Sequence, residues 1–316
     1  MPEVTISRRS ALIGAACVPI AAGLANSTAA LAAAPMQDGG GTPFARFKTG
    51  AFEVNTLLDA ASTRDNPQNI FGLNVSADEF KSVSDENFIP SDRTRFFFTP
   101  TVINTGNELV LFDTGLGANG GNIAGALASA GYTPEQVDVV VITHMHPDHI
   151  GGLMTNDTPT FPNARYVTGA VEYDFWTKEG AEGGAGELVG KLVKPLAEKM
   201  TFVKDGEAVV SGVTAVEAFG HTPGHIVYMV ESNGEQLLLA ADLANHYVWS
   251  LAYPEWEVLF DMNKEAAAAQ RKKVLGMLAA DKIPFVGYHM PFPALGYVQA
   301  RGSGFQYVPA SYQLQL

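Results

Sequence analysis

The chain is poor in cysteine and in basic residues. Its one cysteine, Cys17, lies near the start of a 316-residue sequence, inside a segment with the order of a cleavable export signal. If that segment is removed, no disulfide, cysteine nucleophile or thiolate metal ligand remains. Lysine and arginine number 20 against 33 aspartates and glutamates, and no long basic run follows residue 9. The net charge of −13 therefore disfavours a nucleic-acid partner, whose phosphate backbone needs clustered positive charge.

The first thirty-odd residues have the order of a secretory signal. Arg8 and Arg9 precede an apolar stretch over 11–25, and small residues follow with a small-x-small cleavage pattern at 30–32. The arginine pair favours the bacterial twin-arginine route, and an ordinary secretory signal or a membrane anchor is the alternative. The apolar stretch is short and alanine-rich for a membrane span. We expect an export signal over 1–32, a flexible leader over 33–43, and a periplasmic or secreted protein without a stable membrane span.

Residues 44–316 are expected to form one α/β domain. The composition, 47% hydrophobic and 17% charged, is that of a chain with a sizeable core. Short β-branched runs alternate with helical segments, which indicates helices layered on sheets. Strands are predicted at 95–103, 108–113, 137–143 and 284–289, among others, and helices at 188–199 and 263–280. The last of these helices should carry Arg271 and Lys272 on its polar side, and the polar stretch 62–92 should be a long loop with a short helix.

The stretch "THMHPDHIGG" at 143–152 follows an apolar run that is typical of a strand buried on both faces. In an extended segment, residues two apart point the same way, so His144 and His146 can face one metal. Asp148 and His149 come after Pro147, where the chain must turn, so they can face a second metal. Imidazole and carboxylate ligands suit zinc, iron, manganese or cobalt.

Three further ligand candidates each follow a predicted strand. His221 lies in "FGHTPGH", Asp242 ends "LLLAAD", and His289 ends "PFVGYH". Gly220 and Gly224 would let the backbone turn tightly around the first of them. Ligands delivered by the ends of several strands predict a metal-binding rim at one edge of a sheet.

These motifs, together with Asp113 in "LFDTG", resemble in order and spacing the metallo-β-lactamase fold hydrolases. The resemblance covers about 44–316 and implies a four-layer αβ/βα sandwich, in which two mixed sheets are flanked by helices. It also implies two metal positions: His144, His146 and His221 would hold the first metal, Asp148, His149 and His289 the second, and Asp242 would bridge them. Asp113 would orient the loop that carries the histidines, with a plain turn aspartate as the alternative.

The closest likeness within that family is to the methyl parathion hydrolase and organophosphate hydrolase branch, which adjoins the N-acyl homoserine lactone lactonases. It is carried by "GYTPEQVD", "GHTPGH" and "HMPFPALGYVQARGSGFQYVPASY". Phe175 and Trp176 match the family's "FW" and are expected near the substrate pocket, with core packing as the alternative. Asn245 stands where the lactonases have a tyrosine. His246 is expected either to line the pocket or to lie at the surface, and His225 to be structural.

The resemblance implies an exported dinuclear hydrolase with two divalent ions, most simply zinc, that cleaves lactones, aryl esters or phosphotriesters. A hydroxide shared by the metals would attack the substrate, and Asp148 would pass a proton to the leaving group. The alternatives are a glyoxalase II-like thioesterase and a non-catalytic metal-binding protein of the same fold. The expected partner is a small-molecule substrate, and a homodimer is a further hypothesis.

Overall fold

The computed structural model describes residues 42–311 of the chain. The predicted export signal over 1–32, Cys17 and almost all of the predicted leader lie outside these residues. Within the described range, no helix is both long and apolar enough to cross a membrane.

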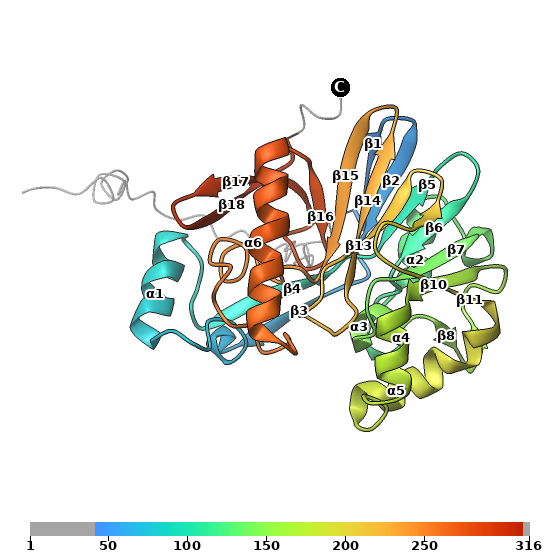
Figure 1. The fold of residues 1–316 in the computed structure, drawn as a ribbon, viewed down its shortest axis with the longest axis horizontal. Coiled ribbons are helices and arrows are strands. Elements are labelled where there is room, and N and C mark those ends of the chain that lie inside the picture. The colour runs from blue at the N-terminus through green and yellow to red at the C-terminus, as the bar shows by residue number, and fades with distance from the viewer. Residues whose placement is uncertain (1–41, 312–316) are drawn as a thin grey trace, which may run out of the picture. The chain divides into compact units, whose positions relative to one another are not determined.

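Two seven-stranded sheets form the centre of the domain (Figure 1). In spatial order, the first sheet contains β1 (Phe44–Thr49), β2 (Phe52–Leu57), β5 (Thr101–Asn104), β6 (Leu109–Phe112), β7 (Val139–Ile142), β10 (Arg165–Gly169) and β11 (Met200–Val203). The second contains β12 (Ala208–Val210), β13 (Val213–Glu217), β14 (Ile226–Ser232), β15 (Glu235–Ala241), β16 (Phe285–Gly287), β17 (Leu295–Arg301) and β18 (Gly304–Pro309). Both sheets mix parallel and antiparallel pairs, as β6 and β7 are parallel and β5 and β6 antiparallel.

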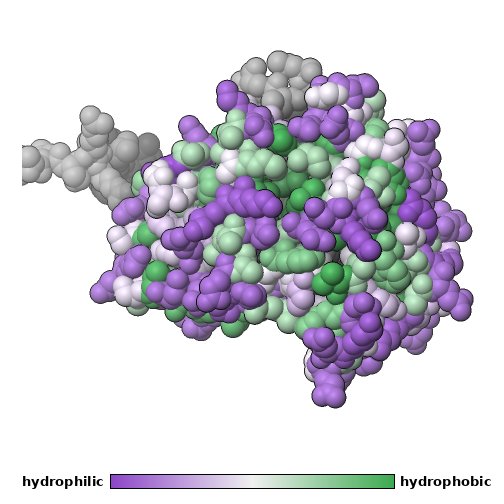
Figure 2. All heavy atoms as spheres, viewed as in Figure 1, coloured by the Kyte–Doolittle hydropathy of each residue, from purple (hydrophilic) through white to green (hydrophobic). Residues whose placement is uncertain are grey.

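The described residues form six α-helices, four of which cover the outer faces of the two sheets. They are α1 (Ala77–Glu86), α2 (Ile123–Ser129), α3 (Pro147–Ile150), α4 (Ala170–Thr177), α5 (Gly184–Leu192) and α6 (Lys264–Asp281), with short 3₁₀ turns at Pro67–Asn69, Gly117–Asn119, Pro134–Gln136 and Lys194–Lys199. One apolar core lies between the sheets, and a second lies between the first sheet and α2, α4 and α5. In Figure 2, hydrophobic residues show between hydrophilic ones over the middle of the face, and hydrophilic residues predominate around its edge. The predicted four-layer αβ/βα sandwich is confirmed.

Strand β7 shows why the run before the histidines is apolar without interruption. Val139 and Val141 point into the core between the sheets, whereas Val140 and Ile142 point into the core under the helices. Successive side chains of a strand face opposite sides, so a strand buried on both sides has no polar position. The prediction of a fully buried strand is confirmed, and the strand delivers the histidine loop from the centre of the fold.

Three sequence predictions differ from the structure in ways that matter for the site. The strand predicted over 95–103 is two strands, β4 (Arg93–Phe98) and β5, because Pro100 interrupts the ladder. The segment 62–92, predicted as a loop, starts inside a strand, β3 (Ala60–Asp65). This strand pairs with β4 and forms a separate two-stranded ribbon. The helix predicted at 188–199 is α5, which begins at Gly184, followed by a 3₁₀ turn around Pro195. A small hairpin of β8 (Met154–Thr155) and β9 (Thr158–Pro159) follows the histidine loop.

Helix α6 confirms the helix predicted over 263–280, but one residue expected on its polar side, Arg271, is buried. The side chain of Asn263 caps the helix by accepting a hydrogen bond from the backbone N–H of Ala266. Arg271, which we expected on the polar side, is 1% exposed, whereas Lys272 is exposed. The buried guanidinium has an acidic partner that the helical pattern alone does not reveal.

Candidate metal centre

The seven predicted ligands all lie just beyond strand ends at one edge of the two sheets. His144 and His146 follow β7, Asp148 and His149 lie on the short helix α3, His221 follows β13, Asp242 follows β15, and His289 follows β16. Residues separated by up to 145 positions in the sequence therefore meet because the strands that carry them end at the same edge.

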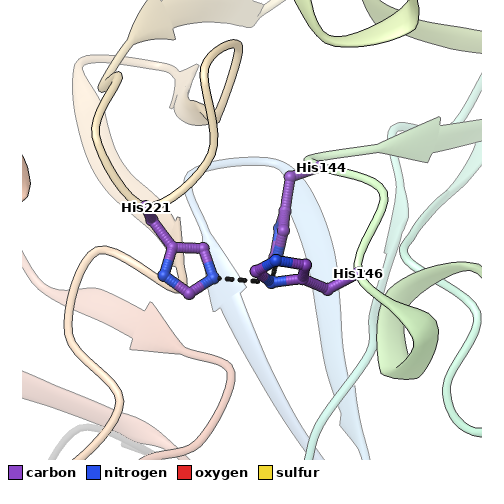
Figure 3. A group of neighbouring side chains, drawn as sticks. All are labelled: His144, His146 and His221. Atoms are coloured by element: carbon purple, nitrogen blue, oxygen red, sulfur yellow. Dashed lines mark hydrogen bonds between the residues drawn. The ribbon is translucent and has the colours of Figure 1, made fainter. Parts of the chain in front are cut away.

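The first group contains His144, His146 and His221 (Figure 3). The Nδ1 atom of His146 lies 3.1 Å from Nε2 of His144 and 2.9 Å from Nε2 of His221. Three ring nitrogens thus converge on one point. Gly220, with φ of 135°, makes this approach of the His221 loop possible, because a Cβ there would lie 2.3 Å from the backbone nitrogen of Ala267.

The second group contains Asp148, His149 and His289. Oδ2 of Asp148 lies 3.3 Å from Nε2 of His289 and 3.5 Å from Nε2 of His149. The side chain of Asp148 is 21% exposed, whereas those of His149 and His289 are almost fully buried. This group therefore has one carboxylate that solvent and a bound molecule can reach.

Asp242 lies between the two groups. Its Oδ2 is 3.3 Å from Nε2 of both His221 and His289, and its Oδ1 is 3.2 Å from Nε2 of His149. The residue before it, Ala241, has a left-handed backbone with φ of 44°, where strand β15 ends. One carboxylate thus reaches both sets of ring nitrogens.

The arrangement fits two divalent cations. Nε2 of His149 and Oδ1 of Asp242 are buried and have no hydrogen-bond partner among residues 42–311. Burial lowers the pKa of His146 to about 3 and that of His144 well below its usual value, so both rings offer neutral lone pairs. Burial raises the pKa of the Asp148 carboxyl, but His149 and His289 outweigh it and bring the pKa to about 2. Five imidazole and two carboxylate ligands suit two ions of zinc, iron, manganese or cobalt.

Asp113 uses both carboxylate oxygens on the histidine loop. Its Oδ2 lies 2.8 Å from Nδ1 of His149 and accepts from the hydroxyl of Thr143, while Oδ1 accepts from the backbone N–H of Thr143. With Nδ1 held in this way, Nε2 of His149 points to the cluster. The structure therefore gives Asp113 the contacts of a residue that orients the loop.

Two further histidines are held at Nδ1 by groups that the sequence did not reveal. Nδ1 of His221 lies 2.9 Å from Oδ1 of Asp261, whose Oδ2 accepts from Nη1 of Arg271 at 2.6 Å. Nδ1 of His289 donates to the carbonyl oxygen of Phe97 at 2.7 Å. Burial raises the pKa of Asp261, but His221 and Arg271 outweigh it, so the carboxylate stays charged. The 40-residue separation of Asp261 from its histidine hid this pair from sequence reasoning.

Glu172 in α4 ties together the two loops that carry the first group. Its Oε1 accepts from the backbone N–H of Met145 and from Nε1 of Trp176. Its Oε2 accepts from the hydroxyl of Thr222 and the backbone N–H of Gly224. Sequence reasoning stopped at the "FW" pair beside it and missed this fully buried carboxylate.

The remaining predicted residues take distinct places. Nδ1 of His225 lies 3.1 Å from the carbonyl oxygen of Ala218, and its Nε2 accepts from the backbone N–H of Asp242, as a structural histidine would. Asn245 is buried and donates from Nδ2 to Oδ2 of Asp242 at 2.8 Å, so it supports the central carboxylate instead of facing the pocket. His246 is buried rather than at the surface and lines a cavity next to the cluster.

A cavity of about 260 Å³ opens on the cluster. His146, Asp148, Asp242 and His289 form its floor, and apolar side chains of Phe96, Phe98, Leu116 and Phe260 form its walls with Arg64. Phe175 and Trp176 do not line it, which corrects their expected place in the pocket wall. The centre of the Trp176 ring lies 6.1 Å from that of His146, and its Nε1 donates a hydrogen bond to Glu172. Phe175 packs edge-on against Trp176.

Comparison with known proteins agrees with this geometry. The metallo-beta-lactamase superfamily matches residues 96–284 of the chain. The uncharacterised protein YobT of Bacillus subtilis is 25% identical over 192 residues, covering 56% of this chain and 76% of YobT. The N-acyl homoserine lactonase AttM of Agrobacterium fabrum is 30% identical over 125 residues, covering 37% of this chain and 45% of AttM. The chain therefore matches less than half of the lactonase's length.

Solved structures extend the likeness over nearly the whole domain. AidC, a dizinc quorum-quenching lactonase in complex with the product N-hexanoyl-L-homoserine, has a TM-score of 0.80 and 28% identity, covering 85% of this chain and 98% of AidC. The hydrolase AbOPH of the β-lactamase superfamily has a TM-score of 0.79 and 23% identity, covering 86% of this chain and 99% of AbOPH. The expected resemblance to hydrolases that adjoin the lactonases is confirmed.

Proposed function

The chain belongs to the metallo-beta-lactamase superfamily, and from that membership we propose that it is a dinuclear metal-dependent hydrolase of lactones, aryl esters or phosphotriesters. The observation that carries this proposal is the position of Asp242, whose two oxygens reach ring nitrogens of both ligand groups. The first ion would be held by His144, His146 and His221, and the second by Asp148, His149 and His289, with Asp242 shared. Two such ions supply an activated water at neutral pH and neutralise charge that develops on the substrate.

The protein's own residues would bind the substrate and move the proton. Phe96, Phe98 and Leu116 offer an apolar wall for the uncharged part of an ester and exclude water from it. Asp148 is ionised and is the partly exposed carboxylate at the cavity floor. Its Oδ atom can take the proton of the attacking water and pass it to the oxygen of the leaving group, so that an ester and water yield an acid and an alcohol.

The hydrogen bonds around the site fix the ligands before any substrate arrives. Asp113, Asp261 and the carbonyl of Phe97 each hold a histidine at Nδ1, and Asn245 holds Asp242. Ligands that are oriented in advance need not reorganise when the substrate binds, which favours catalysis over loose metal binding. A cavity that opens on the cluster likewise favours an enzyme over a non-catalytic metal protein, because purely structural zinc sites are closed by protein ligands.

A thioesterase of the glyoxalase II kind is less well supported. Relatives of this chain that carry a named activity are lactonases, such as AidC and AttM. Zinc is the metal we propose, in keeping with the dizinc lactonase AidC. Acyl-homoserine lactones are disfavoured as substrates, because Asn245, which stands where the lactonases have a tyrosine, donates to Asp242 and does not line the cavity at the cluster.

A substrate panel tests the proposed activity. The purified holoenzyme would be assayed with paraoxon-like triesters, aryl esters, γ- and δ-lactones, acyl-homoserine lactones and S-lactoylglutathione, with and without a chelator. We expect chelator-sensitive hydrolysis of at least one of the first four classes. Hydrolysis of S-lactoylglutathione alone would replace the proposal with the thioesterase, and no hydrolysis of any class by fully loaded protein would refute it.

We also propose export and a homodimer. The twin-arginine motif, Arg8–Arg9, supports export, and it lies outside the described residues. Fractionation of cells that express the full chain and its Arg8→Lys/Arg9→Lys variant would test the route, because loss of export in the variant is the expected result. Light scattering of the purified protein would decide between dimer and monomer.

A further inference from the structure

The ribbon of β3 and β4 separates two cavities. Phe96 and Phe98 face the cavity at the metal cluster, whereas Arg93, Arg95 and Phe97 face a second cavity of about 370 Å³. This division follows from the alternation of side chains along a strand. His289 lines both cavities, so the two lie next to each other at this residue.

The second cavity is positively charged in a strongly acidic chain. Among residues 42–311, no aspartate or glutamate lines it, whereas Arg93 and Arg95 do. Within the described part of the chain, Arg95 has no ion pair, and its guanidinium lies 5.7 Å from the centre of the Phe97 ring. Arg93 has only a 3.7 Å contact with Asp92, and both are exposed. An anion at the mouth of this cavity would therefore be attracted by Arg95, which no ion pair offsets, and by Arg93, whose charge Asp92 offsets in part.

His246 offers a hydrogen-bond donor inside the same cavity. Its Nδ1 accepts from the backbone N–H groups of Val248 at 3.1 Å and Trp249 at 3.2 Å, so the ring proton must be on Nε2. No residue in 42–311 makes a hydrogen bond with that Nε2. The ring is only 8% exposed and stacks on Trp249 with 4.1 Å between the ring centres. His246 lines the cavity, so a bound molecule that offers an acceptor there can take this N–H.

Much of the remaining lining is apolar. Phe97 presents an aromatic ring, and Ile89, Pro90 and Pro291 add apolar surface. An aromatic ring of a ligand would stack against these surfaces, with an oxygen toward Nε2 of His246 or toward Arg95. The combination of apolar walls with one aromatic ring, an imidazole N–H and two guanidinium groups fits an aromatic carboxylate.

We propose that the second cavity is a specificity pocket that binds the carboxylate-bearing aromatic part of the substrate while its ester bond lies at the cluster. This inference rests on the proposed hydrolase function and narrows its substrate class to anionic aryl esters. Neutral triesters and acyl-homoserine lactones would leave the arginines and His246 without an acceptor of matching charge.

A matched pair of esters tests the pocket. The holoenzyme would be assayed with 4-acetoxybenzoate and with 4-acetoxybenzamide, which differ chiefly in charge. We expect kcat/KM to be about tenfold higher for the carboxylate, because a charge-assisted hydrogen bond contributes about that factor. The preference should shrink at high ionic strength, since the arginines are exposed.

Three variants assign the preference to its residues. Arg95→Gln removes the charge, and His246→Asn keeps an acceptor for the backbone of Val248 but removes the Nε2 donor. Each should reduce the ratio of kcat/KM values toward one. Lys273→Gln, at an exposed position on α6 away from the cavity, removes the same unit of charge and should leave the ratio unchanged.

The outcomes separate this inference from the function on which it rests. If other esters are hydrolysed but the two acetoxy compounds react equally, or if Arg95→Gln and His246→Asn keep the preference, the pocket assignment is wrong and the hydrolase stands. If no ester reacts, the proposed function is wrong, and calorimetry with 4-hydroxybenzoate still tests the pocket. Binding that weakens about tenfold in Arg95→Gln supports it, and absent or unchanged binding overturns it.

Discussion

The two sides of the proposed active site are held together by different forces. The ligand side is a network of buried polar groups at strand ends, in which Asp113, Glu172 and Asp261 bind the ligand loops. The opposite wall is a separate apolar core, in which Phe71, Phe80, Trp249 and Trp256 pack together beneath the β3–β4 ribbon.

The difference implies that chemistry and specificity can change independently. A buried polar network tolerates little change, because each lost partner leaves a charged or polar group unsatisfied. An apolar core accepts other side chains of similar volume at a small cost. The wall can therefore be altered for a new substrate while the metal positions stay as they are.

The largest effect is expected on the ligand side. Replacing His146 by alanine should lower kcat/KM by more than about 100-fold, because loss of a group that merely orients a ligand already costs 10–100-fold. Elemental analysis should show loss of metal in the same variant, with the circular dichroism spectrum unchanged. A variant that keeps its metals and its activity would remove His146 from the ligand set.

The buried pair behind His221 gives the next effect, now on stability. Replacing Arg271 by leucine leaves the Asp261 carboxylate buried without its cation and should destabilise the fold by about 3–5 kcal/mol. Lys272, the next residue, pairs with Glu255 at the surface, and Lys272→Met should not change stability measurably. Urea unfolding would measure both. Equal effects of the two substitutions would contradict the account of the ligand side.

A cavity in the apolar wall should lower the stability of the protein without lowering its metal content. Phe80→Ala removes a ring that stacks on both Trp249 and Trp256 and should cost about 3–5 kcal/mol of unfolding free energy. Metal content should stay at the wild-type value, because neither Phe80 nor the two tryptophans belong to the ligand groups. Loss of metal in this variant would show that the two sides are coupled.

A smaller effect is expected where the ligand loops meet. Glu172→Gln keeps the shape of the side chain but points an amide at donors that need an acceptor. It should destabilise the protein by about 1–3 kcal/mol for each donor left without a partner. Thermal unfolding would measure the loss, and a variant as stable as the wild type would show that Glu172 does not tie the loops.

The same comparison explains how far the sequence could predict this site. The ligands could be found because a strand buried on both faces must end before His144, and the spacing of His146 and Asp148 follows from local geometry. The groups that hold the ligands could not, because Asp261 and Glu172 reach them only through the tertiary fold. Arg271 looked like a surface residue for the same reason. The ribbon over the apolar wall was not predicted, because the stretch 95–103 looked like one strand. Pro100 divides it into β4 of the ribbon and β5 of the first sheet.

The most direct test of a dinuclear centre is the metal content of the Asp242→Asn variant. The account predicts about two divalent ions per chain in the wild type. It also predicts that removing the charge shared by both positions lowers the metal content and kcat/KM together. A variant that retains both ions and wild-type activity would contradict the dinuclear account, because Asp242 would then not join the two positions.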